Sequence, residues 1–136
     1  MKLQIKPLTH MPHYKVFVRI APSKINGVGV FAIREIKKGQ YIFYGDNEKL
    51  VWIERNKIKH LPTKIKKLYE DFCVLKNGCY GCPNNFNLLT PAWFLNHSVK
   101  PNLGCDKNYN FYSIKKIKMG EELTVDYSTY TDTRIL

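Results

Sequence analysis

The sequence predicts a mainly β fold, built from short strands with one helix near the middle of the chain. Three observations support this prediction: many short strand-like runs, a single helix-like stretch, and no regular alternation of strands with helices. The chain has 136 residues, of which 44% are apolar. A chain of this length can bury a hydrophobic core of its own without disulfides or a structural metal ion. We therefore expect a single domain over residues 1–136, with its core at about 14–130 and a helical insert at about 54–90.

The expected strands are rich in β-branched and aromatic residues and are separated by turn residues. The first is expected at residues 14–20, where apolar and polar residues partly alternate. Further strands are expected at residues 28–32, 41–44, 51–53, 111–114 and 123–127. Residues 77–87 are rich in glycine, asparagine and cysteine, which predicts a loop.

One helix is expected at about residues 62–75. Its apolar residues recur at steps of four and three, the spacing of one helix face, and Pro62 suits a first helical turn. These residues are Leu61, Ile65, Leu68, Phe72 and Leu75.

Two short segments repeat the same spacing. Ile33, Ile36, Lys37 and Gly39 are spaced like Ile114, Ile117, Lys118 and Gly120, and a strand-like run follows each set. Two copies are too few for a solenoid, so two strand–turn–strand units of similar build are expected.

The chain is strongly basic, with 22 lysines and arginines, 11 acidic residues and a net charge of +11. Such a charge favours anionic partners, which include nucleic acid and acidic protein surfaces. Only four of the basic residues are arginines, so a reader of DNA sequence is not favoured. A lysine-rich solvated surface without a partner explains the same composition.

The four cysteines, Cys73, Cys79, Cys82 and Cys105, leave three interpretations open. Cys79 and Cys82 have the spacing of half a zinc site, to which Cys73 could add a third ligand, and the same pair could be redox-active. Reduced packing residues are the third interpretation. The chain has no long apolar run and its first residues lack the apolar middle of a signal peptide, so we expect a soluble intracellular protein with reduced thiols.

Three segments are unusual for a plain scaffold. The first is Asn26-Gly27-Val28-Gly29, in which two glycines open a strand, as a tight turn or a loop close to a ligand would require. The second is Asn96-His97-Ser98, whose polar side chains follow an apolar run and must find hydrogen bonds if they are buried. The third is the stretch GEELTVDY at residues 120–127, a strand that ends in a tyrosine.

Together and in this order, the three segments resemble the SET-domain protein lysine methyltransferases of the short stand-alone type. The likeness covers about residues 14–130 and rests on Gly-x-Gly, Asn-His-Ser-x-x-Pro-Asn and Gly-Glu-Glu-Leu-Thr-x-Asp-Tyr. It implies a SET-domain (β-clip) fold of small sheets, in which the last motif threads through a loop as a pseudoknot beside Asn96 and His97.

The resemblance also implies a reaction and a site. The family transfers a methyl group from S-adenosylmethionine to a lysine that enters a narrow channel from the opposite face. Tyr127 matches the active-site tyrosine. The residues implied to bind the cofactor are Lys24, Gly27, Val28, Gly29, Asn96, His97 and Tyr127, and those implied to line the substrate channel are Tyr44, Phe94, Val125 and Tyr130.

The chemistry implied by the resemblance needs no metal, but it does need a neutral amine. A free lysine has a pKa of about 10.4, so only about one amine in a few hundred is neutral at pH 8. An apolar channel beside a sulfonium lowers that pKa. Tyr127 is expected to orient the amine or polarise the methyl group and not to act as a strong base, because a phenol near pKa 10 is mostly protonated.

The sequence departs from the family at several positions. No cysteines match those of a C-terminal zinc site, so no metal is expected, and Tyr130 or the last residues are candidates to close the channel. Tyr44-Gly45-Asp46 is one residue short of the family pattern, and Trp93 stands where an arginine is common. Val125, two positions before Tyr127, leaves mono-, di- and trimethylation open.

Partners follow from the same resemblance. The substrate is expected to be a lysine-containing protein, with a histone as one candidate, and acidic residues near the channel could offset the repulsion between two basic molecules. These are Glu121, Glu122 and Asp126, with Glu70 and Asp71 on the helix. Non-specific contact with DNA through the basic surface and a homodimer are further expectations. A nuclear or chromatin-associated location is expected in a eukaryotic cell, and a cytoplasmic one otherwise. The alternative function is a non-catalytic SET-like binding module or chromatin adaptor.

Overall fold

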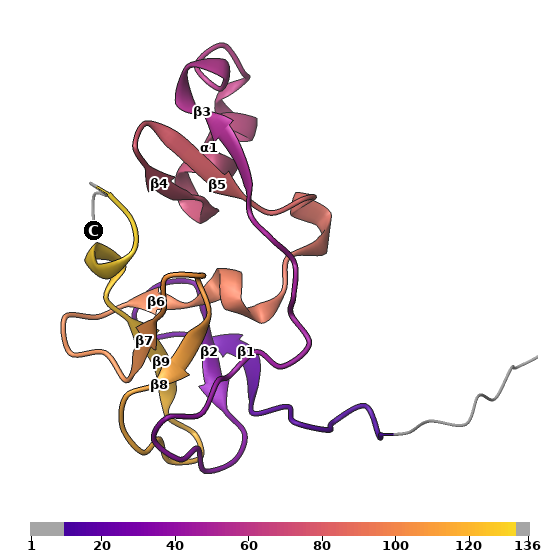
Figure 1. Ribbon diagram of the computed structural model, residues 1–136, viewed down its shortest axis with the longest axis vertical. Helices are drawn as coiled ribbons and strands as arrows, with labels where there is room; N and C mark the ends of the chain where they lie inside the picture. Colours follow the sequence, from indigo (N-terminus) through magenta and orange to yellow (C-terminus); the bar gives the residue numbers. More distant parts are fainter. Residues whose placement is uncertain (1–9, 133–136) are drawn as a thin grey trace, which may run out of the picture.

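The computed structural model describes residues 10–132 (Figure 1). Most of the core belongs to a six-stranded sheet, in which β1, β2, β9, β7 and β8 are neighbours in that order and β6 also pairs with β9. These strands are β1 (Val18–Pro22), β2 (Val28–Ala32), β6 (Asn96–His97), β7 (Leu103–Cys105), β8 (Phe111–Ser113) and β9 (Glu122–Val125). The strand β9 pairs antiparallel with β2 and parallel with both β6 and β7. The strand β9 therefore lies between β7, which precedes it by about twenty residues, and β2, which precedes it by about ninety. This arrangement positions the site described below.

A second sheet of three strands is built from the segment between β2 and β6, in the order β3-β5-β4. Its strands are β3 (Val51–Glu54), β4 (Val74–Lys76) and β5 (Cys79–Cys82), and the helix α1 (Thr63–Phe72) lies between β3 and β4 in the chain. Figure 1 shows these elements together at one end of the molecule, and we call residues 51–82 the insert. Short 3₁₀ helices occupy Arg55–Lys57, Phe86–Leu88, Pro91–Phe94 and Tyr127–Thr129.

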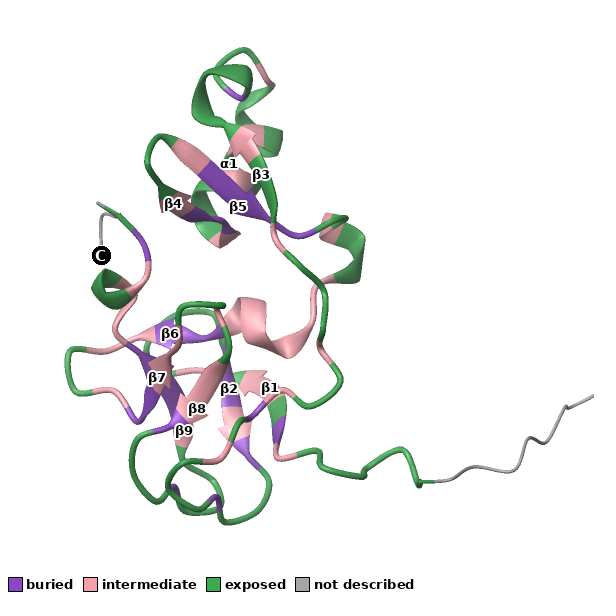
Figure 2. Cartoon of the chain, viewed as in Figure 1, coloured by how far each residue is buried: buried purple, intermediate pink, exposed green. Residues whose placement is uncertain are grey.

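Each sheet has its own hydrophobic cluster. The core cluster is centred on fully buried residues of β2, β7, β9 and the turns beside them, among them Val30, Leu103 and Leu123. The cluster of the insert consists of Ile58, Cys73, Tyr80 and Cys82, with partly buried residues around them. In Figure 2 the buried segments accordingly form one group in the large sheet and a separate one at β4 and β5.

The repeated sequence segments form two matching turns at the end of the large sheet away from the insert (Figure 1). Ile36 and Ile117 are fully buried and exchange two backbone hydrogen bonds, of 2.8 and 2.9 Å. Gly39 N–H donates to the Ser113 carbonyl, and Gly120 N–H donates to the Ala32 carbonyl, both at 2.8 Å. The two turns therefore face one another with approximate twofold symmetry, as two units of similar build.

The structure confirms the mainly β fold class with one mid-chain α-helix and corrects several element bounds. The first strand begins at Val18 and not at residue 14, because Lys15 has a φ of +54° that interrupts extended backbone. Residues 41–44 form isolated bridges at Tyr41 and Phe43 where a strand was expected. The helix ends at Phe72, because Cys73 is extended and leads into β4. The loop expected at residues 77–87 was wrong for Cys79–Cys82, which pairs with both β3 and β4.

The cysteines are free thiols in this structure. Cys73 and Cys82 are buried in the cluster of the insert, and burial raises the pKa of Cys105 to about 12. Within residues 10–132, no three His, Cys, Asp or Glu side chains gather in a way that could hold a metal ion. In the same range, no helix has the length and apolar character needed to span a bilayer.

Candidate active site

Three distant segments of the chain meet at the side chain of Asn96, on β6. Its Nδ2 atom lies 3.2 Å from the carbonyl oxygen of Asn26 and 3.1 Å from that of Val28. It also lies 2.9 Å from Oε2 of Glu122, at the start of β9. Asn96 is only 6% exposed, so these contacts satisfy a buried amide. The structure thus brings the Gly-x-Gly loop, the Asn-His-Ser segment and the last motif into one place.

The carboxylate of Glu122 is the centre of this arrangement. It accepts hydrogen bonds from the Ser23 hydroxyl, at 2.8 and 2.9 Å, as well as from Asn96. Gly29 makes this close approach feasible, because a Cβ there would overlap the Glu122 carboxylate. Gly27, by contrast, has a φ of +47° and open space where a Cβ would stand. One face of the loop is therefore fixed by the buried network and the other face is open.

His97 and Tyr127 are joined through the backbone. The Tyr127 N–H donates to Nδ1 of His97 at 3.1 Å, and the two rings lie 5.1 Å apart. Because Nδ1 accepts this bond, Nε2 is the ring nitrogen left to donate a hydrogen bond. Nδ1 also lies 3.9 Å from Oδ1 of the Asp126 carboxylate. The hydroxyl and N–H of Ser128 donate to Asp126 and lower the pKa of that carboxyl.

The hydroxyl of Tyr127 makes a second contact, at the other end of the residue from the backbone N–H that binds His97. It donates to the carbonyl oxygen of Leu95 at 2.5 Å, which fixes the ring between the end of β9 and the start of β6. A phenol that donates its hydrogen in this way keeps its oxygen lone pairs as acceptors. Tyr127 is thus held at both ends and presents an acceptor to the space beside Leu95.

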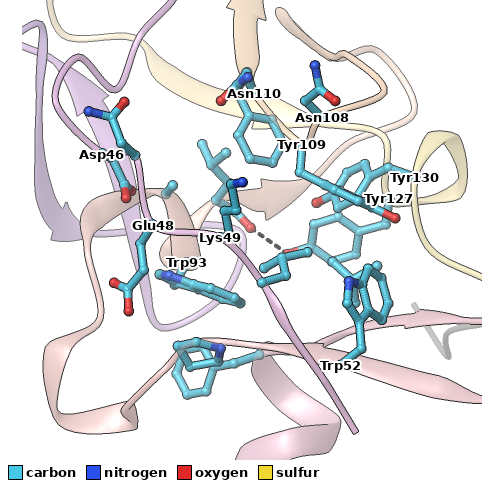
Figure 3. A pocket seen from close by; sticks show the side chains of 18 of the residues that line it. Asp46, Glu48, Lys49, Trp52, Trp93, Asn108, Tyr109, Asn110, Tyr127 and Tyr130 are labelled. Atoms are coloured by element: carbon cyan, nitrogen blue, oxygen red, sulfur yellow. Dashed lines mark hydrogen bonds between the residues drawn. The ribbon is translucent and has the colours of Figure 1, made fainter.

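That space is a cavity of about 570 Å³ between the large sheet and the insert (Figure 3). Tyr127 and Tyr130 lie side by side on one wall, with their rings 6.1 Å apart. The aromatic and aliphatic residues that line the cavity are Leu50, Trp52, Phe72, Val74, Pro83, Ala92, Trp93, Leu95, Tyr109, Phe111, Tyr127 and Tyr130. Its volume lies in the range of ligand-binding pockets, and aromatic rings form much of its lining.

The charged residues around the cavity contrast with the rest of the chain. Asp46, Glu48 and Asp71 line it, with Lys49 and Lys107. Acidic residues therefore outnumber basic ones here, although basic residues outnumber acidic ones two to one in the whole sequence. Such a pocket attracts a cation more than the protein as a whole does.

The other residues expected at the channel, Tyr44, Phe94 and Val125, are not among those that line this cavity. Phe94 packs against the core cluster and against Phe72 of α1, with ring centres 5.5 Å apart. Val125 is fully buried in the core cluster. Tyr44 is exposed and lines a neighbouring cavity of about 460 Å³, where the Lys15 ammonium lies 4.9 Å from its ring.

Two further expectations concern the rim of the site. Lys24 is exposed on the loop that Ser23 anchors, two residues before Asn26. Tyr130 lines the cavity, and closure by residues 133–136 lies outside the described residues.

Several residues of the cavity were missed by sequence analysis, in particular Trp52, Tyr109 and Glu48. Trp52 stands in a strand expected at residues 51–53, and three successive apolar residues do not show which side chains are exposed. Tyr109 is surrounded by polar loop residues and carries no motif. The one usable signal was a tyrosine between two asparagines, at a place where a turn prefers small polar residues.

Comparison with known proteins places these features in a family. The model of the SET domain matches residues 27–128, more than half of the chain. Among curated proteins, the histone-lysine N-methyltransferase trithorax of Drosophila virilis is 28% identical over 129 residues, and that match covers 84% of this chain. The H3 lysine-36 specific histone-lysine N-methyltransferase of Candida albicans is 26% identical over 120 residues, with 82% of this chain covered. The chain spans only 3% and 14% of the length of these two relatives.

Solved structures share the fold. A candidate histone methyltransferase of Plasmodium falciparum superposes with a TM-score of 0.52 at 21% identity, covering 82% of this chain and 93% of its own. A humanized mutant of the Chaetomium thermophilum Polycomb Repressive Complex 2, bound to the inhibitor GSK126, gives a TM-score of 0.57 at 18% identity. That match covers 87% of this chain and 16% of the solved one. These likenesses show the fold.

Proposed function

The chain belongs to the SET-domain family, and on that basis we propose that it transfers a methyl group from S-adenosylmethionine to the side-chain amine of a lysine in a protein substrate. The observation that carries this proposal is the position of Tyr127. Its backbone is bonded to His97 beside the Gly-x-Gly loop, and its hydroxyl faces the aromatic cavity together with the Leu95 carbonyl. One residue therefore touches both the proposed cofactor side and the proposed substrate side.

The residues near Gly27 fit the proposed cofactor. The loop is rigid on the side of Asn96 and Glu122 and open at Gly27, so its backbone can approach a ligand closely. His97 retains an Nε2–H that can donate a hydrogen bond to a heterocycle. When bound, S-adenosylmethionine supplies a methyl group on a sulfonium, whose carbon–sulphur bond breaks as the bond to the lysine nitrogen forms. Lys24, Gly27, Val28, Gly29, Asn96, His97 and Tyr127 would hold it.

The cavity would prepare the lysine for reaction. Burial beside Tyr127 and the positive charge of the cofactor's sulfonium would both disfavour an ammonium at the reacting position and so lower the pKa of the amine, which would release its proton to solvent. The oxygen of Tyr127 can then accept a hydrogen bond from the amine, or weak C–H contacts from the methyl group, and so fix the direction of attack. Holding two reactants in line in this way supplies several kcal/mol of the rate enhancement.

The proposed substrate is a histone, and the proposed location is nuclear or chromatin-associated. Two curated relatives are named as histone-lysine methyltransferases, although this chain corresponds to a small part of each. Asp46, Glu48 and Asp71 at the cavity give a basic protein one region that favours a basic peptide.

Transfer of tritiated methyl groups from S-adenosylmethionine to mixed histones and to cell extract tests the proposal. We expect Tyr127→Phe to lower kcat about a hundredfold, since the amine loses the acceptor that orients it. Tyr112→Phe, on β8 outside the lining of the cavity, is the matched control and should retain full activity. Asn96→Ala should raise KM for the cofactor. Equal activity of Tyr127→Phe and the wild type would contradict the proposed role, and tight DNA binding without labelling of any protein would favour a non-catalytic binding module.

We also propose non-specific contact with DNA through the two matching turns. Their exposed basic residues are Arg34, Lys37, Lys38, Lys115, Lys116 and Lys118, and the acidic residues among them are Glu35 and Glu121. Glu35 is paired with Lys116 at 3.5 Å across the turns. Because the turns lie at the end of the sheet away from the insert, DNA bound there would leave the cavity open (Figure 1).

Salt-dependent binding of a DNA duplex tests this contact. Changing Lys37, Lys38, Lys115 and Lys118 together to Gln should lower the slope of log K against log salt by about three to four, since each lost phosphate contact removes about 0.9. The control changes Lys57, Lys59, Lys64 and Lys66 of the insert to Gln, which alters the net charge equally. Equal loss in both variants would show attraction by net charge alone. A homodimer stays a prediction of the sequence, which light scattering tests.

A further inference from the structure

Two aromatic rings from different parts of the chain face one another at the cavity. Trp52 comes from β3 of the insert and Tyr109 from the turn between β7 and β8. Their ring centres are 6.0 Å apart and the rings are tilted by 55°. Trp52 is 45% exposed, and Figure 3 shows it on the same side of the cavity as Tyr127 and Tyr130. The pair forms an open aromatic corner beside the proposed reaction site.

Tyr109 occupies a backbone conformation that disfavours its side chain. Its φ is +61°, in the left-handed region. The turn is a three-residue hairpin loop, in which Tyr109 N–H donates to the Asp106 carbonyl at 3.0 Å and Asp106 N–H donates to the Asn110 carbonyl at 2.9 Å. The left-handed position of such a loop is normally glycine or asparagine. A tyrosine at this position is therefore strained. An asparagine, the residue type on either side of it in the sequence, adopts this backbone more readily.

The surroundings hold the turn in place despite this strain. The Asp106 carboxylate accepts from the N–H groups of Asn108 and Asn110, at 2.8 and 3.0 Å. It also accepts from the Tyr41 hydroxyl at 3.1 Å. On the other wall, the Trp52 ring lies against Gly81 of β5, its partner in the strand register. Strained residues that are fixed in this way cluster at functional sites.

The chemistry of the corner suits a cation. Aromatic faces attract ammonium and guanidinium groups placed within about 6 Å of the ring centre. The lining of the cavity adds three carboxylates against two ammonium groups, in a chain of net charge +11. Burial raises the pKa of the Tyr109 phenol, and Cys105 and the Asp132 carboxylate add smaller contributions in the same direction.

We propose that Trp52 and Tyr109 bind the cationic side chain of an arginine or lysine that flanks the target lysine in the substrate. The corner would thereby select basic sequences, while the target lysine itself enters beside Tyr127. This inference rests on the proposed function, because it assigns the specificity of the same site.

Two peptides that differ at one flanking residue test it. One carries the target lysine next to arginine, and the other carries citrulline there, which keeps the shape and removes the charge. We expect the wild type to show a KM about fivefold lower for the arginine peptide, with kcat unchanged. Trp52→Leu and Tyr109→Gly should each remove this preference by raising KM for the arginine peptide only, and Tyr109→Phe should keep it. Tyr14→Ala, an exposed aromatic residue outside the lining of the cavity, is the control.

Stability separates a specificity role from a packing role. A ring kept only to pack the fold would lower Tm when removed, whereas Tyr109→Gly should leave Tm within about 3 °C because relief of the left-handed strain offsets the lost contact. Equal KM values for the two peptides in the wild type, or a preference that survives in Trp52→Leu, would overturn the inference. Peptide affinity measured by fluorescence anisotropy keeps it separate from the proposed function: an arginine preference in binding supports the corner even if no methyl group is transferred.

Discussion

Glu122 shows how much a single residue organises at this site. Its carboxylate joins Ser23 and Asn96, which are far apart in the sequence, and its backbone carbonyl accepts from the Asn102 side chain at 2.9 Å. Removing the side chain takes one of its acceptors from the buried Asn96 amide and takes the carboxylate acceptor from the Ser23 hydroxyl. The position of the Gly-x-Gly loop therefore depends on Glu122. The sequence motif contains two adjacent glutamates and does not show which of them has this role.

Substitution at Glu122 tests this dependence. Glu122→Ala should lower the free energy of unfolding by about 2–3 kcal/mol, because Asn96 and Ser23 lose their shared acceptor in a partly buried site. Glu122→Gln, which retains one acceptor, should cost less. Urea unfolding measures both, with Glu54→Ala at the exposed end of β3 as a control that should change stability by under about 0.5 kcal/mol. A cost at Glu122 no larger than at Glu54 would contradict the role of the network.

At the scale of elements, the last described residues tie the insert to the core. The N–H of Leu75, on β4, donates to the Thr131 hydroxyl at 2.9 Å, and the Asp132 N–H donates to the Leu75 carbonyl at 2.6 Å. The Asp132 carboxylate accepts from the N–H of Asn77 at 2.8 Å. These bonds run alongside the cavity and fix the distance between its two walls.

Loss of the Thr131 hydroxyl should loosen this connection. Thr131→Val keeps the shape of the side chain and removes the acceptor, so the amide of Leu75 should exchange its hydrogen about fivefold faster, as expected for a net loss of roughly 1 kcal/mol. Thr63→Val, at the exposed start of α1, is the control. Unchanged exchange at Leu75, measured by NMR, would show that the insert is held by other contacts.

The elements also show what the sequence could and could not predict. Residues 28–32 were predicted with the right bounds because a glycine turn and β-branched residues agree there. The strands β6 and β7 have two and three residues and exist through their pairing with β9, so no local periodicity marks them. The hairpin of β4 and β5 turns at Asn77-Gly78, both with positive φ, and this dipeptide was interpreted as part of a loop although it is a strong hairpin signal.

For the molecule as a whole, the cavity exists only where two separately packed units meet. The sequence motifs predicted the half of the site that belongs to the large sheet, where Asn96, His97 and Tyr127 lie together. They carried no information on the insert, whose Trp52 completes the other wall. We propose that the chain is a single SET domain, residues 1–136, in which the insert shapes this second wall. In this proposal the motifs of the large sheet correspond to the reaction, and the insert would determine the choice of substrate.

The connection at Thr131 has a thermodynamic consequence. Tyr127, Tyr130 and Thr131 lie within five residues of one another. The tyrosines of the cavity and the hydrogen bonds to Leu75 of β4 therefore belong to one short segment of the chain. A ligand that displaces Tyr130 on binding in the cavity would also strain the hydrogen bonds at Leu75. By reciprocity, a protein that binds the insert and changes these hydrogen bonds would change the affinity of the cavity for that ligand. Reciprocity of this kind would allow the choice of substrate to be adjusted from the outer surface of the molecule, far from the reacting atoms.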